Sequence, residues 1–211
     1  ILKHFYPADH PYSWSVIGSM EDLSAASYDD VAEFCKNYYL PNNATLVIAG
    51  DIDPADTRKK VEYWFSDVQS GNKGKSPKAA AFELSGEICE VLEDNVQLPR
   101  LYIAYPTPAR YAPGDAELDV LANVLAKGKN SRLYKRLVYD LQIAQDVTAY
   151  QESNTLGSKF MIIATARPGH TLQELKTAID EEIQKIHNSG ITERERQRAL
   201  NQYETQFLNA F

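Results

Sequence analysis

Cysteine is scarce in this chain, which has only two, Cys35 and Cys89, among 211 residues. Two thiols so far apart in the sequence do not predict a disulfide framework or a cysteine-based metal site. Cys35 falls in a segment with helical periodicity and Cys89 in a strand-like segment, where a free cysteine packs as a small apolar residue. We therefore expect both to be buried, while a single disulfide between them stays open.

The sequence also lacks the short motifs of common catalytic sites. It contains no H-x-x-E-H, H-E-x-x-H, C-x-x-C, P-loop or nucleophile-elbow pattern. Its four histidines are not spaced as ligands of one metal ion: His4, His10, His170 and His187. We expect His10 to make a structural hydrogen bond and His187 to complement a helix dipole. The residues alone predict neither a catalytic site nor a metal site.

Long apolar runs and excess basic charge are absent as well. No stretch of eighteen apolar residues occurs, which predicts no membrane span. The 29 acidic residues outnumber the 22 basic ones and give a net charge of −7, which disfavours nucleic acid as a partner. The one basic cluster, Lys127–Arg136, leaves a local anion contact open, with a solvated helix face as the alternative.

The clearest local pattern is KNYYLPNNATLVIAGDID, from Lys36 to Asp53. The helix that enters it must end at Pro41, because proline lacks an amide hydrogen and restricts the residue before it. The two asparagines that follow favour a sharp turn. The apolar and β-branched residues 44–49 then predict a strand buried in a sheet.

The rest of the chain predicts a second unit of alternating hairpins and helices. Residues 69–82 are the predicted linker, since they are rich in Gly, Ser, Lys and Pro and have no periodicity. The expected strands are 87–92, 98–105, 144–151 and 159–166, and the expected helices are 115–125, 131–141, 171–189 and one that starts after Thr192. This order predicts an α+β fold, with helices packed on one face of antiparallel-rich sheets.

Five segments, in this order, resemble the pitrilysin/insulinase-type zinc peptidases, also called inverzincins. They are HPYSWSVIGSMEDL (His10–Leu23), YYLPNNATLVIAGDID (Tyr38–Asp53), LPRLYIAYPTP (Leu98–Pro108), GKNSRLYKRLVYDLQIAQDVTAYQ (Gly128–Gln151) and IIATARPG (Ile162–Gly169). The final GITERERQRALNQ looks like the closing helix of that family. The resemblance implies pitrilysin/processing-peptidase-like domains, which pair into halves that close around a peptide.

In that family the zinc ion is held by the two histidines of H-x-x-E-H and by a downstream glutamate, and the motif glutamate activates the bound water. Both elements precede the segment that resembles His10–Leu23, so they would fall before Ile1. Since the chain begins without methionine and stops within a predicted helix, we interpret it as an excised, internal fragment. The resemblance implies zinc in the parent protein and no zinc bound by this fragment.

The resemblance also implies a division of the chain. Residues 1–68 would be the C-terminal part of the zinc-bearing domain without its metal motif. Residues 69–82 would be the linker, and residues 83–211 a non-catalytic partner domain, truncated at its C-terminus.

One departure from the family pattern bears on which half this is. Non-catalytic halves often carry an Arg and a Tyr, seven residues apart, that hold the substrate backbone. The matching positions here are Val138 and Gln145, so the pair is missing. The surrounding sequence is more similar to the first, zinc-bearing half of long two-half bacterial enzymes. A location in the bacterial periplasm or cell envelope follows only from this resemblance.

The implied function is that of a scaffold and substrate-chamber fragment of a zinc metalloendopeptidase, which hydrolyses peptides or unfolded polypeptides. Its partners would be the peptide substrate and the missing remainder of the same chain or a homologous half, with no nucleic acid. The alternative is a non-catalytic peptide-binding or assembly subunit of the same family. An intact H-x-x-E-H before Ile1 would favour the peptidase.

We single out Ser131, Arg132 and Tyr134 as candidate substrate-binding residues. A guanidinium can pair with the carboxylates or carbonyls of a peptide. The alternative is that Tyr134 packs in the core and Arg132 is an exposed surface residue. No residue of this chain is expected to be catalytic or to bind metal.

Overall fold

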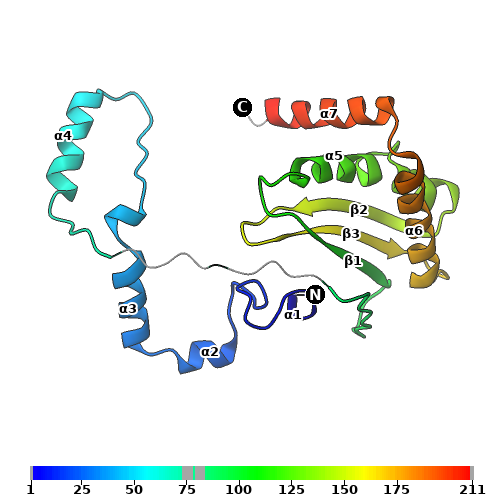
Figure 1. The fold of residues 1–211 in the computed structure, drawn as a ribbon, viewed down its shortest axis with the longest axis horizontal. Coiled ribbons are helices and arrows are strands. Elements are labelled where there is room, and N and C mark those ends of the chain that lie inside the picture. Colours follow the sequence, from blue (N-terminus) through cyan, green and yellow to red (C-terminus); the bar gives the residue numbers. More distant parts are fainter. Residues whose placement is uncertain (1, 73–77, 79–83, 210–211) are drawn as a thin grey trace. The chain divides into compact units, whose positions relative to one another are not determined.

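The computed structural model describes residues 2–72, 78 and 84–209. The chain divides into two compact units, one of residues 9–78 and one of residues 3–8 together with residues from 79 onward. Figure 1 shows the elements of both units. Residues 73–77 and 79–82, which make up most of the predicted linker, lie outside the described residues.

The unit that starts at residue 79 is built on an antiparallel sheet of three strands, β1 (Arg100–Thr107), β2 (Ala144–Glu152) and β3 (Ser158–Ala166). Their order in the sheet is β1-β3-β2, so β3 is the central strand. Ile162 of β3 lies opposite Ile103 of β1 and Ala149 of β2. The continuous apolar run of β3 is explained by this position, because nearly all of its residues are buried.

Helices cover one face of this sheet, which confirms the predicted α+β fold. The helices that contact the sheet are α5 (Asp115–Ala126), the π-helix η2 (Tyr134–Asp140) and α6 (Leu172–Ser189), and α7 (Glu193–Leu208) packs on α5. In Figure 1, α5 lies on the sheet and α7 lies over α5. The fully buried Leu137, Leu175 and Ile179 join Ile162 in the core between helices and sheet. Each such side chain contributes about 1.5–3 kcal/mol.

The predicted starts of the last two helices are confirmed by their N-terminal caps. The hydroxyls of Thr171 and Thr192 accept hydrogen bonds from the backbone N–H of Glu174 and Glu195. The carboxylates of the two glutamates accept hydrogen bonds from the backbone N–H of the threonines, which completes a capping box at each helix. Residues 3–5 of the short helix α1 (Leu2–Phe5) also belong to this unit.

Three expectations for this unit are wrong. Residues 87–92 are not a strand, because no strand of the described chain pairs with them and an isolated extended segment leaves its backbone hydrogen bonds unmade. Cys89 in this segment is exposed rather than buried. The strand β1 also runs through Pro106, where we expected it to end. It can do so because an edge strand tolerates proline.

The unit of residues 9–78 contains α2 (Met20–Ala25), α3 (Tyr28–Tyr38), the 3₁₀ helix η1 (Pro41–Asn43) and α4 (Pro54–Phe65). Ser27 and Asp30 form a capping box at the start of α3, and Asp53 caps α4. The helix does end before Pro41. The short helix α2 was not predicted, although Ser19 caps it by accepting a hydrogen bond from the Asp22 N–H.

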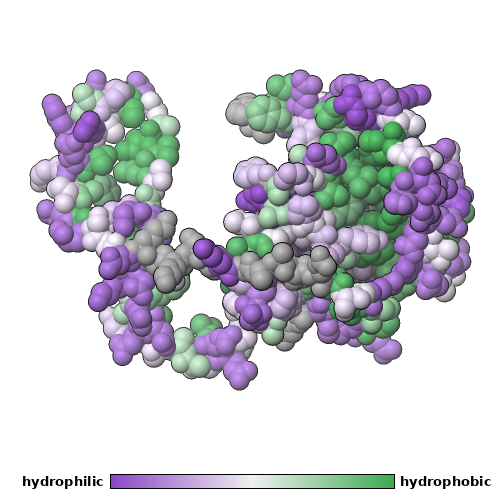
Figure 2. Space-filling view, in the orientation of Figure 1, coloured by the Kyte–Doolittle hydropathy of each residue, from purple (hydrophilic) through white to green (hydrophobic). Residues whose placement is uncertain are grey.

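The described helices of this unit bury no residue, and residues 44–49 form no strand. The predicted strand is therefore wrong for this chain, since its described residues offer no neighbouring strand to pair with. Phe34, Val47 and Trp64 are 53%, 81% and 73% exposed, and Figure 2 shows hydrophobic side chains on the surface of this unit. Cys35 lies on α3, which buries no residue. It is therefore exposed and free, which contradicts its expected burial.

Candidate functional site

The predicted contact residues follow the turn that leaves α5. Ser131 is fully buried, and its hydroxyl donates a 2.6 Å hydrogen bond to the carbonyl oxygen of Gly128. Gly128 has φ +80°, a left-handed conformation that favours glycine, and a β-carbon there would lie 3.7 Å from the amide nitrogen of Gln202. The Ser131 hydroxyl thus closes the turn.

Arg132 is held by the turn between α6 and α7. Its Nε and Nη2 lie 2.6 and 2.7 Å from the two carboxylate oxygens of Glu195, and Nη2 also donates to the carbonyl of Gly190 at 3.2 Å. The two charged side chains are only 18% and 16% exposed. The hydrogen bonds from Arg132 lower the pKa of Glu195 to about 2, against the opposing effect of burial.

The structure does not bring the three predicted residues together on one surface. Ser131 bonds within its own turn, Arg132 bonds to Glu195, and Tyr134 is half-buried against the core of the unit. Arg132 is therefore not the exposed residue of the alternative interpretation. A substrate-binding role for Ser131, Arg132 and Tyr134 stays a prediction.

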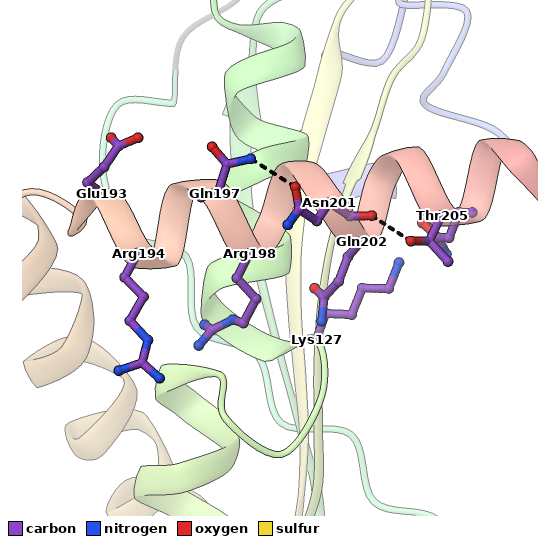
Figure 3. A pocket seen from close by; sticks show the side chains of 9 residues that line it. Lys127, Glu193, Arg194, Gln197, Arg198, Asn201, Gln202 and Thr205 are labelled. Atoms are coloured by element: carbon purple, nitrogen blue, oxygen red, sulfur yellow. Dashed lines mark hydrogen bonds between the residues drawn. The ribbon is translucent and has the colours of Figure 1, made fainter.

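A shallow hollow of about 900 Å³, wide open to solvent, lies along α7. One face of α7 and the residue that ends α5 line it, including Lys127, Arg194, Arg198, Asn201 and Gln202. In Figure 3 the side chains of Arg194 and Arg198 extend to the same side of α7, and Gln202 extends toward Lys127. We call this hollow the α7 groove.

Two residues that line the α7 groove each have a buried polar atom without a partner among the described residues. Arg198 Nη2 and Gln202 Oε1 are both buried and make no hydrogen bond with any described residue. An unsatisfied buried polar group costs about 1–3 kcal/mol, so such groups are rare in proteins. Sequence reasoning missed this groove, although the four-residue spacing of Arg194, Arg198 and Gln202 places them on one helix face.

Other polar contacts in this unit fix helices rather than form a site. The Asp115 carboxylate accepts hydrogen bonds from Ser153, Gln151 and the Tyr111 backbone, and these bonds lower its pKa. Burial raises the pKa of Asp119, which is hydrogen-bonded to a tyrosine of α7. These carboxylates have protein partners and hold α5 to the sheet and to α7.

No metal centre is found in the part of the chain that the structure describes. Among those residues, no three or more His, Cys, Asp or Glu side chains lie close enough together to hold a metal ion. His10 is buried, and its Nδ1 accepts a 3.0 Å hydrogen bond from the Tyr12 N–H, which confirms the structural role expected for it. Within the described ranges, no helix is long and apolar enough to cross a membrane.

Comparison with known proteins gives relatives along nearly the whole chain. The zinc protease PqqE of Helicobacter pylori is 26% identical over 189 residues, which cover 88% of this chain and 43% of that protein. The uncharacterized zinc protease YmxG of Bacillus subtilis is 25% identical over 194 residues, covering 92% and 46%. The chain thus spans less than half the length of these relatives.

Solved structures of proteases also resemble this chain. A protease from Helicobacter pylori, 25% identical, superposes with a TM-score of 0.74 over 95% of this chain and 49% of its own. The periplasmic protease PqqL from Escherichia coli, 20% identical, has the same fold with a TM-score of 0.64, over 92% of this chain and 22% of its own. The family model described as the peptidase M16 inactive domain matches residues 25–203. The expected resemblance is thereby confirmed, and the chain belongs to the peptidase M16 family.

Proposed function

We propose that this chain is a scaffold and substrate-chamber part of a zinc metalloendopeptidase that hydrolyses peptides or unfolded polypeptides. In this proposal the zinc ligands and the general base lie elsewhere in the parent protein. The family match to the inactive domain and the relatives named zinc proteases support it. Residues 1–68 would complete the zinc-bearing domain, and residues 83–211 would form the partner domain.

The observation that carries the scaffold role is the uncovered apolar surface of residues 9–72. Amphipathic helices and β-branched segments are stable when they bury their apolar side against another layer. Here α3 and α4 bury no residue, and the whole of the segment 44–49 is exposed. We infer that residues 44–49 pair as a strand with a sheet of the remainder of the parent chain, and that α3 and α4 cover that sheet.

Zinc belongs, in this proposal, to the parent protein. The described residues do not fit a zinc site, because they contain no cluster of suitable donors. The contribution of this chain to catalysis is then to stabilise the domain that binds zinc and to enclose the peptide. A periplasmic or cell-envelope location is proposed from the likeness to the periplasmic PqqL alone.

Two matched variants of the full-length protein, each with one alanine replaced by aspartate, test the scaffold role. Ala49→Asp puts a charge into the proposed buried strand, whereas Ala55→Asp puts it into the first turn of α4, where a carboxylate is favourable. We expect Ala49→Asp to lower the hydrolysis of an unfolded polypeptide at least tenfold and Ala55→Asp to leave it unchanged. Equal activity of the two variants would contradict the proposed strand.

The alternative function, a non-catalytic peptide-binding or assembly subunit, makes a different prediction for the parent. Its upstream segment would lack an intact H-x-x-E-H, and the full-length protein would bind peptide without cleaving it.

A further inference from the structure

Tyr111 has an unusual backbone conformation. Its φ of +65° lies in the left-handed region, where a bulky side chain is rarely found. Among the described residues, Gln142 is the other non-glycine residue with such a φ, but it follows η2, and a left-handed residue commonly ends a helix. Tyr111 ends no helix, because it lies in the turn between β1 and α5. Its conformation is unfavourable and therefore persists only with support from its surroundings.

Hydrogen bonds from two sides hold this turn in place. The Tyr111 N–H donates to the Asp115 carboxylate at 2.9 Å, and the Arg110 N–H donates to the carbonyl of Asn154, also at 2.9 Å. The Arg110 guanidinium donates to the carbonyl of Ser153. Asp115 is only 7% exposed, and its carboxylate also accepts a 2.6 Å hydrogen bond from the Ser153 hydroxyl. A buried carboxylate is costly unless it is bonded in this way, so the turn is rigidly held.

The rigid turn presents an aromatic side chain to the outside. Tyr111 is 93% exposed, so its ring contributes nothing to the core of its own unit. It lines neither the α7 groove nor the smaller hollow between η2 and α6. Tyrosine is among the residues that contribute most to protein–protein contacts, because its ring offers a large contact area and loses little conformational entropy on binding. A projecting ring of this kind fits into a pocket of a partner.

A pocket for a tyrosine ring requires a folded surface, which a small molecule or an unfolded peptide does not offer. The matched part of the two curated relatives is 43% and 46% of their length, so a protein of that size has further folded parts. We propose that Tyr111 inserts into a pocket on another folded part of the parent protein and fixes its own unit against that part. This inference rests on the proposed place of the chain within a larger protein.

Photo-crosslinking in the full-length protein tests the identity of the partner. Tyr111 is replaced by photoreactive p-benzoylphenylalanine, and crosslinked peptides are identified by mass spectrometry. We expect position 111 to crosslink to one region of the parent outside residues 1–211, with or without an added unfolded polypeptide. Crosslinks mainly to the added polypeptide or to a second copy of the protein, or an absence of crosslinks, would overturn the proposal.

A glycine substitution distinguishes a contact residue from a merely strained turn. Tyr111→Gly removes the ring together with the unfavourable φ, whereas the matched control Gln142→Gly relieves the same kind of φ at the end of η2. We expect the melting temperature of the full-length protein to fall by at least about 2 °C in Tyr111→Gly and to stay equal or rise in Gln142→Gly. An equal change in both variants, in either direction, would overturn the proposal. Neither experiment measures cleavage, so failure of the proposed peptidase function would not affect these outcomes.

Discussion

At the residue scale, the most informative contact is the ion pair between Arg132 and Glu195. It joins the segment after α5 to the start of α7, and both side chains are more than four-fifths buried. The sequence could suggest Arg132 as a binding residue but could not identify its partner, which lies 63 positions away. Helix starts were easier to predict, because the caps Thr171 and Thr192 act on residues only three positions away.

Replacing Arg132 by alanine should lower the free energy of unfolding by about 2–4 kcal/mol, because the Glu195 carboxylate would be left largely buried without its partner. Urea unfolding followed by circular dichroism measures this change. The control is Arg196→Ala on α7, the helix that also carries Glu195. The ion pair of Arg196 with Glu193 is exposed and worth under about 1 kcal/mol. Equal effects of the two variants would contradict the structural role of Arg132.

The same ion pair predicts a pH dependence. The pKa of Glu195 is lowered from 4.5 in its ordinary state to about 2 in the folded chain. A lowered carboxyl pKa contributes stability that is present above pH 4.5 and is lost as the pH falls toward 2. The difference in unfolding free energy between the native chain and Glu195→Gln should therefore shrink from pH 5 to pH 2. A difference that stays constant over this range would argue against the ion pair.

At the scale of elements, local patterns predict the helices and the β2–β3 hairpin, since each depends on residues close in the sequence. The strands expected at 44–49 and 87–92 did not form. Their sequences favour the extended conformation, but a strand also needs a neighbour, and the described residues supply none. The burial expected for Cys35 and Cys89 was wrong because no described element covers the helix and the segment that hold them.

The central strand β3 should be the most sensitive element of its unit. Ile162 is fully buried in the core, whereas the adjacent Ile163 points to the other face of the sheet and is half-buried. We expect Ile162→Ala to cost about 2–5 kcal/mol and Ile163→Ala clearly less, as measured by urea unfolding. A larger loss for Ile163→Ala would mean that the register of β3 is wrong.

At the scale of the whole molecule, the family could be predicted from the order of five segments, whereas the α7 groove could not. The groove depends on Lys127 of one element lying beside α7, which is a tertiary arrangement. The exposed apolar surface of residues 9–72 also appears only in the structure. Both features indicate a chain that works together with other parts of a larger protein.

The most direct test of the central proposal compares zinc content and peptide cleavage in this chain and in the full-length parent, both washed with chelator and then supplied with one equivalent of zinc. The proposal predicts that the parent retains about one zinc per chain and cleaves an unfolded polypeptide. It predicts that this chain alone does neither. One tightly held zinc in this chain, or cleavage by it, would contradict the account.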